Sequence, residues 1–194
     1  MRLILILIAL AGCTYGPVPQ VDVHSEDAAV YRAVLDSMFI PHRSNRITQL
    51  VILDSTSTLR RENLVPGVFR VLHQLPGVDS AAIEDFETRN LEPHSLKYLP
   101  TLGLNFPIVL VTRESLRTLP REDPDTYWDA FYKRYPGSSG SISFSAIGYG
   151  ANGSIALLMV DQGCGSLCGA GHNVVVKREG GRWRLITIQQ TWVS

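Results

Sequence analysis

The dipeptide Gly180-Gly181, set between two β-prone runs, constrains the fold of this chain more than any other feature. Residues 173–179 before it and 182–190 after it are rich in β-branched side chains. A two-residue glycine turn matches the twist of paired strands and predicts a tight hairpin. This hairpin places two pairs of residues opposite each other, Val176 with Leu185 and Arg178 with Trp183.

A second hairpin is predicted immediately before the first. Asn152-Gly153 is a strong turn signal, and it separates the apolar runs 141–149 and 154–162. Segment 163–172 then connects the two hairpins. Together they predict a four-strand antiparallel meander.

A helix is predicted directly before the meander. Asp123-Pro124 indicates its start, because proline suits the first helical position. Pro136-Gly137 indicates its end. Aromatic residues fall at helical spacing between these limits: Tyr127, Trp128, Phe131, Tyr132 and Tyr135. Such a stripe either packs into the core or forms a ligand-facing wall.

The rest of the chain predicts a smaller set of elements. Periodicity and capping residues indicate a helix at 26–39 capped by Ser25, a doubly buried strand at 47–53, a short helix at 80–90 and a strand at 108–111. Residues 60–78, with two prolines and two glycines, predict no long element. We therefore expect a single α+β domain over residues 26–194, in which helices pack on an antiparallel sheet that ends in the meander. Its C-terminal part, residues 123–194, contains the aromatic helix and the meander.

The stretch from Tyr127 to Ser194 resembles an uncharacterised bacterial domain type, over about a third of the chain. The matching motifs are the aromatic helix, Tyr135-Pro136, Ser145 to Tyr149, Cys164 to Gly171 (the CGxLCGxG loop), Gly181-Arg182-Trp183 and Trp192-Val193-Ser194. This resemblance implies a domain type and no activity. A helix laid over a curved antiparallel sheet is also similar in architecture to cystatin-like and NTF2-like folds.

The first residues read as an export signal. Arg2 precedes the apolar run Leu3–Ala11, which is too short to span a bilayer. The run ends in Leu10-Ala11-Gly12-Cys13, which resembles the lipobox of bacterial lipoproteins. That resemblance implies cleavage after residue 12 and acylation of Cys13 with a diacylglyceryl group, carrying fatty acids such as palmitate. The alternative is an uncleaved apolar N-terminus with a buried cysteine.

Lipidation of Cys13 would attach the protein to a membrane of the cell envelope. Several acyl chains on Cys13 give stable anchoring in a membrane. Residues 13–25, which include Pro17 and Pro19, predict a short tether between the lipid and the domain. Thr14 stands where an aspartate commonly signals inner-membrane retention. We therefore expect the cell envelope, and in a Gram-negative organism the outer membrane facing the periplasm.

Cys164 and Cys168 predict a disulfide. Export places them in an oxidising compartment, lipidation occupies Cys13, and the surrounding glycines allow a tight ring. Three alternatives are a metal site formed with His172 and Asp161, a redox-active pair, and a cysteine nucleophile served by His172. A zinc site would need a fourth ligand or water, and the spacing lacks the Cys-x-x-Cys pattern of redox pairs.

The charge balance argues against nucleic-acid binding, since Lys plus Arg and Asp plus Glu both number 18. Gly148-x-Gly150-x-x-Gly153 formally matches a dinucleotide fingerprint. However, a strand-like run follows it in place of the required helix, so we expect a hairpin and no cofactor. Lys177, Arg178, Arg182 and Arg184 either protect a sheet edge or bind an anionic envelope component, such as a lipid headgroup or cell-wall polymer.

The remaining polar residues predict no catalytic constellation. We expect surface positions for four histidines (His24, His42, His73, His94), a polar strand exit at Asp54, and a solvated helical face formed by Glu84, Asp85 and Glu87. The sequence therefore predicts a lipid-anchored envelope protein with a non-catalytic binding or structural domain. Its partners would be the membrane and an envelope protein or anionic ligand. The alternative is an envelope enzyme with a pocket between the aromatic helix at 124–135 and the C-terminal sheet.

Overall fold

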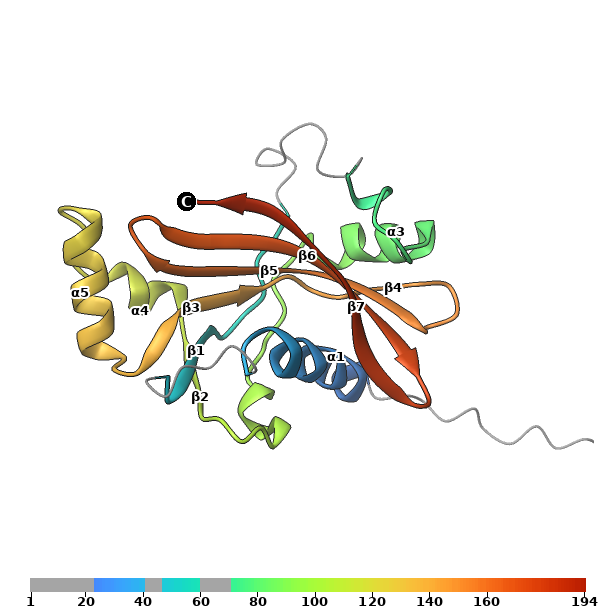
Figure 1. Ribbon diagram of the computed structural model, residues 1–194, viewed down its shortest axis with the longest axis horizontal. Helices are drawn as coiled ribbons and strands as arrows, with labels where there is room; N and C mark the ends of the chain where they lie inside the picture. Colours follow the sequence, from blue (N-terminus) through green and yellow to red (C-terminus); the bar gives the residue numbers. More distant parts are fainter. Residues whose placement is uncertain (1–22, 41–46, 60–70) are drawn as a thin grey trace, which may run out of the picture.

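A computed structural model describes residues 23–40, 47–59 and 71–194. The fold is α+β, as predicted, and is built on a single seven-stranded sheet with the strand order β2-β1-β3-β5-β6-β7, in which β4 also pairs with β5 (Figure 1). The strands are β1 Gln49–Leu53, β2 Ile108–Val111, β3 Ser138–Phe144, β4 Gly148–Tyr149, β5 Ile155–Gly165, β6 Cys168–Glu179 and β7 Arg182–Val193. The helices are α1 Val23–Met38, α3 Ser80–Arg89, the 3-10 helix η2 Leu99–Leu102, α4 Arg113–Arg117 and α5 Pro124–Arg134.

Two helices cover opposite faces of the meander. Successive residues of a strand point to opposite faces of a sheet. Val174 and Val176 of β6 pack with the α1 residue Val34, whereas Val175 packs with Phe86 of α3. All five side chains are fully buried. The core is therefore divided by the sheet, with α1 on one side and α3 on the other (Figure 1).

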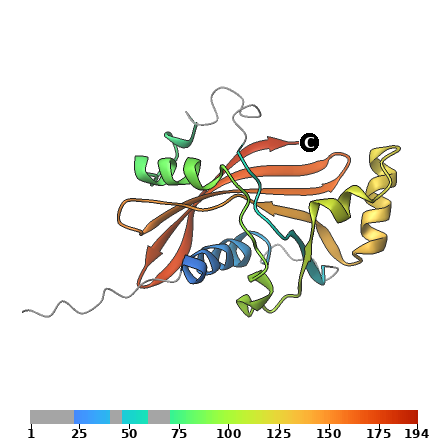
Figure 2. The same cartoon turned by 180° about the vertical axis from the view of Figure 1, so that it is seen from behind.

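A third cluster lies at one end of the sheet, where α4 and α5 pack on β1 and β2 (Figure 2). Phe131 of α5 is fully buried there against Val51 of β1 and Val111 of β2. Strand β1 runs parallel to both of its neighbours, β2 and β3, and the other pairs are antiparallel. The expected sheet is therefore mostly antiparallel, with a parallel part that the sequence did not indicate.

The C-terminal hairpin agrees with its predicted register. Val176 lies opposite Leu185 and Arg178 opposite Trp183, on either side of Gly180-Gly181. The connection between the hairpins differs from the prediction. Residues 163–172 are not a separate linking segment, because β5 and β6 continue through them to a turn at Ser166 and Leu167.

The predicted strand 141–149 is divided into β3 and β4, and the buried side chain of Asn90 explains the break. The Asn90 Oδ1 atom accepts the N–H of Ala146 at 2.8 Å, and its Nδ2 donates to the Ala146 carbonyl at 3.1 Å. This amide takes the place of a neighbouring strand at Ala146. The chain can therefore leave the ladder there without losing its hydrogen bonds.

The ends of the N-terminal elements need small corrections. Helix α1 begins at Val23, so Ser25 lies inside the helix and is not its cap, and the helix takes in residues 23–25 of the predicted tether. Strand β1 begins at Gln49, two residues after the predicted start, and is buried as predicted. The helix at 80–90 and the strand at 108–111 are confirmed. Residues 1–22, which include the predicted signal, Cys13 and most of the predicted tether, lie outside the described residues. Residues 60–70, the first part of the segment 60–78 for which no element was predicted, also lie outside them. Within the described ranges, no helix is long and apolar enough to cross a membrane.

Candidate functional site

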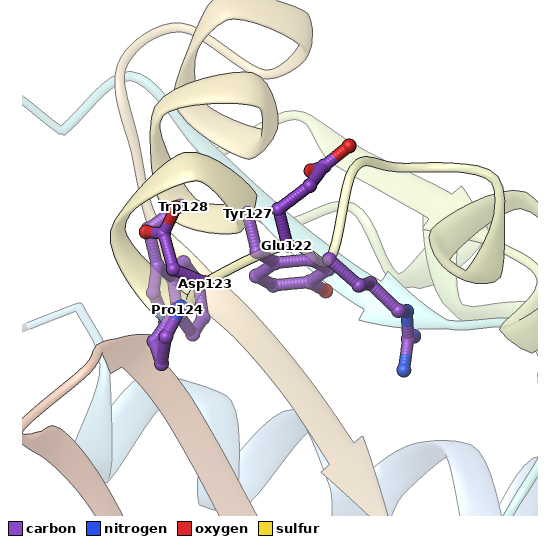
Figure 3. Close-up of a pocket in the computed structure, with 6 residues that line it drawn as sticks. Glu122, Asp123, Pro124, Tyr127 and Trp128 are labelled. Carbon is purple, nitrogen blue, oxygen red and sulfur yellow. The ribbon is translucent and has the colours of Figure 1, made fainter.

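The start of α5 forms an open pocket of about 470 Å³ (Figure 3). The Asp123 carboxylate caps the helix by accepting the Thr126 N–H at 2.8 Å. Hydrogen bonds from the hydroxyl and the N–H of Thr126 lower the pKa of Asp123. The pocket is lined by Arg121, Glu122, Asp123, Pro124, Tyr127 and Trp128.

Aromatic rings give this pocket its shape. The rings of Tyr127 and Trp128 meet edge to face, with centroids 5.2 Å apart, and project from the first turn of α5 (Figure 3). The Arg121 guanidinium lies 5.6 Å from the Tyr127 centroid, at cation–π distance. Burial raises the pKa of Tyr127. The arrangement suits stacking of a flat or apolar group, while the Asp123 carboxylate is engaged in capping the helix.

Aromatic side chains also fill the space between α5 and the sheet, where the alternative hypothesis put a pocket. Phe131 is fully buried in this space. The Trp128 ring packs on the backbone of Gly163, at 3.4 Å from where a Cβ would stand. The Tyr132 hydroxyl donates to the Cys164 carbonyl at 2.7 Å. The aromatic stripe is thus mainly a packing surface, and its pocket lies at the N-terminal end of the helix.

Cys164 and Cys168 close the turn between β5 and β6. Their sulfur atoms lie at disulfide distance, with Cα atoms 5.0 Å apart, within the usual range for this bond. The Ser166 hydroxyl in the turn donates to the Asp125 carboxylate, and the Tyr132 bond to Cys164 adds a second link to α5. The geometry supports the predicted disulfide, which would lock this turn against the aromatic helix.

Reducing this bond is expected to lower the melting temperature by about 4–8 °C. Closing so small a ring removes loop entropy that corresponds to about 2 kcal/mol of stability. Thermal unfolding of the protein with and without reductant measures the effect. A Cys164→Ser/Cys168→Ser variant should have the same melting temperature in both conditions. Two free thiols at these positions, in protein purified unreduced from its native envelope, would rule out the bond.

The structure does not assemble the alternative metal ligands. Cys164 and Cys168 face each other, and His172 lies about 13 Å along β6 from Cys168. The Asp161 carboxylate accepts a hydrogen bond from Trp192 Nε1 at 2.9 Å. Burial raises the pKa of Asp161, against the opposing effect of this bond. Among the described residues, no group of three or more His, Cys, Asp or Glu side chains is arranged to hold a metal.

A network of buried polar groups that the sequence analysis missed joins α1, α3 and β4. The Arg89 Nη2 atom lies 2.7 Å from Asp27 Oδ2, and its Nη1 donates to the Ile147 carbonyl at 2.8 Å. The Tyr149 hydroxyl donates to Asp27 Oδ1 at 2.8 Å. Asp27 lies one helical turn before the buried Tyr31, on the core-facing side of α1. This spacing was the one signal in the sequence that could have indicated a buried carboxylate at Asp27.

Burial controls the protonation of the groups around this ion pair. It raises the pKa of Tyr31, Tyr98 and Tyr149, and the negative charge of Asp27 acts in the same direction. Burial alone would lower the pKa of Arg89, but the hydrogen bond and charge of Asp27 outweigh it, so that the pKa is raised. The phenols therefore stay neutral and the guanidinium stays charged.

The ion pair forms one wall of a cavity of about 320 Å³. Tyr31, Tyr98 and His94 contribute aromatic walls, and Ser95 a hydroxyl. This volume falls in the range of small-ligand sites. Because Asp27 and Arg89 already bind each other, the cavity has the features of a binding site more than those of a reaction centre. It is more enclosed than the pocket at the start of α5.

The other polar residues singled out from the sequence lie apart from each other. His73 and His94 are exposed, as expected, and His94 Nε2 bonds to the Arg89 carbonyl at 2.7 Å. His42 and the side chain of His24 lie outside the described residues. Asp54 is half-buried where β1 ends. In the acidic group of α3, Glu84 is exposed and Glu87 half-buried, while Asp85 is not merely solvated, because it accepts the Tyr149 N–H at 2.8 Å.

The glycines of the formal dinucleotide fingerprint belong to a hairpin, as the sequence analysis expected. Gly148 pairs with Leu157 across β4 and β5, and Gly153 occupies the connecting turn with a φ of 63°. No helix begins there to receive a phosphate group. Comparisons with protein-family models, curated proteins and solved structures find no match to this chain.

Proposed function

We propose that this protein is a lipid-anchored component of the cell envelope, with a non-catalytic domain that binds a ligand or a partner. The observation that carries the anchoring is the sequence Leu10-Ala11-Gly12-Cys13 after a short apolar run. The first described helix begins at Val23, ten residues after Cys13. This spacing leaves a short connection between an acylated cysteine and the domain.

The contacts within the domain support a binding role over a catalytic one. Catalytic acids, bases and nucleophiles need polar atoms that remain accessible to a substrate. Here the Asp27 carboxylate accepts bonds from Arg89 and Tyr149, and Asp123 serves as a helix cap. Two of the cavities in the described part of the chain, at the Asp27–Arg89 pair and at the start of α5, instead offer aromatic walls with a few polar groups, which is typical of ligand sites.

Replacing Cys13 by alanine is expected to move the protein from the membrane fraction to the soluble fraction, because no acyl chain can then be attached. Fractionation of cells that express each form measures the change. The mass of the N-terminal peptide identifies the lipid on the unmodified chain. A Cys164→Ser/Cys168→Ser variant is the matched control and should remain with the membrane. Unchanged fractionation of Cys13→Ala would contradict the anchoring.

A further inference from the structure

The turn between β6 and β7 is basic and lies beside the first turn of α1 (Figure 1). The Arg178 guanidinium forms an ion pair with Glu26, and Trp183 Nε1 donates to the same carboxylate at 3.0 Å. These contacts fix the start of α1 to the turn. Its basic side chains, called the basic turn below, are Lys177, Arg178, Arg182 and Arg184.

The basic turn and the disulfide turn lie at opposite ends of one strand. Strand β6 has 12 residues, from Cys168 to Glu179, and therefore spans about 40 Å. Figure 1 shows α5 at one end of the molecule and the β6–β7 turn at the other, and Figure 2 shows the same arrangement from behind. The start of α1 thus lies far from the aromatic pocket and from the disulfide turn.

This placement decides which end of the domain an anchor at Cys13 would hold near the bilayer. The ten residue-to-residue steps from Cys13 to Val23 reach at most about 36 Å when fully extended. They join the domain at the basic turn. A membrane-bound Cys13 therefore holds the basic turn within about 36 Å of the lipid surface, and lets α5 and the disulfide turn lie farther away.

The charges of the basic turn are only partly neutralised within the domain. Lys177 lies 3.4 Å from Glu179, and Arg178 pairs with Glu26. Arg182 and Arg184 are exposed, and no described carboxylate lies within ion-pair distance of either. Among the described residues of this region, four cations face two anions, which leaves a formal charge of two on Arg182 and Arg184.

We propose that the basic turn binds anionic lipid headgroups of the membrane that holds Cys13, and thereby orients the domain with α5 away from the bilayer. This inference rests on the lipid anchoring proposed above. A basic residue near an anionic surface contributes about a fivefold factor to the ratio of docked to undocked domain. Arg182 and Arg184 together would contribute about 30-fold.

Hydrogen exchange of the full lipidated chain in vesicles tests this contact. The protein is reconstituted in phosphatidylcholine alone or in phosphatidylcholine with phosphatidylglycerol, and deuterium uptake is followed in peptides that cover residues 177–184. We expect slower uptake with phosphatidylglycerol. High salt should abolish the difference, because it shortens the screening length to about 3 Å at 1 M.

Two double variants separate a specific contact from a general charge effect. Arg182→Gln/Arg184→Gln should lose the difference between the two lipids. Arg113→Gln/Arg117→Gln removes the same charge from exposed sites on α4, at the other end of the molecule, and should keep it. Equal uptake in both lipids, or a difference that survives in Arg182→Gln/Arg184→Gln, would overturn the proposed contact.

Vesicle flotation distinguishes failure of this inference from failure of the anchoring. A chain that floats with both kinds of vesicle but shows equal exchange contradicts only the contact of the basic turn. If protein purified from its native envelope carries no lipid on Cys13 and floats only with phosphatidylglycerol, the contact is supported and the anchoring is contradicted. A chain that floats with neither contradicts both proposals.

Discussion

Replacing Asp27 by asparagine is expected to lower the free energy of unfolding by about 3 kcal/mol, because it leaves the Arg89 charge without its partner. The side chains of Asp27 and Arg89 are only 11% and 18% exposed, so water cannot replace the lost carboxylate fully. The Tyr149 hydroxyl also loses the anionic acceptor of its hydrogen bond. The melting temperature should fall by about 6–12 °C, which thermal unfolding measures directly.

Asp36→Asn is the matched control for this substitution. Asp36 also lies on α1 and pairs with Arg32 at 3.5 Å, but about half of each side chain is exposed. Exposed pairs of this spacing contribute about 0.3–0.5 kcal/mol. Replacing both buried partners, as in Asp27→Leu/Arg89→Met, should recover part of the stability lost in Asp27→Asn, because no buried charge then lacks a partner, although the Ile147 carbonyl and the Tyr149 hydroxyl lose theirs. If Asp27→Asn and Asp36→Asn lower the free energy of unfolding equally, the buried pair stabilises the fold no more than the exposed pair does.

Gly148→Ala is expected to destabilise the domain by about 3 kcal/mol or more, because α3 lies against the backbone of β4. A Cβ atom on Gly148 would lie 2.3 Å from the Ala82 carbonyl oxygen and 2.5 Å from the Phe86 nitrogen. Both are backbone atoms and cannot move aside as a flexible side chain could. The helix would have to shift away from the sheet and open the contact around the fully buried Phe86. Chemical denaturation of the two proteins gives the difference in unfolding free energy.

Gly163→Ala provides the comparison for Gly148→Ala. Gly163 is also a strand residue without a positive φ, and its nearest neighbour for a new Cβ is the Trp128 ring at 3.4 Å. This is an ordinary contact distance, so we expect a change of less than about 1 kcal/mol. A large loss in Gly163→Ala, or a small one in Gly148→Ala, would contradict the close approach of α3 to β4.

The features that the sequence predicted depend on neighbours along the chain. Gly180 and Gly181 have φ angles of 56° and 79°, which glycine adopts at little cost, and this turn sets the register of Val176 with Leu185. The start of α5 followed in the same way from Asp123-Pro124, because the proline occupies the first helical position. In both cases, the residues that determine the structure lie within a few positions of each other.

The unpredicted features depend on residues far apart in the sequence. Arg89 meets Asp27 across 62 positions, and Asn90 meets Ala146 across 56. No local pattern marks such partners, since each residue alone fits a helix end or a helix surface. The parallel pairing of β1 was not predicted for a similar reason, because a buried apolar strand fits any interior position in a sheet. The candidate cavity was therefore beyond sequence reasoning, although the aromatic helix was not.

The position of β1 between β2 and β3 sets an order for folding. Strands β5, β6 and β7 follow one another through short turns, so their pairing closes only small loops. Strand β1 pairs instead with residues 108–111 and 138–142, more than 50 positions away. Closing such long loops is slow, because chain entropy is lost before any contact forms. The meander can thus assemble on its own, whereas β1 pairs with β3 only after a long loop has closed. Strand β2, whose strand neighbour in the described sheet is β1, joins the sheet together with β1 or after it.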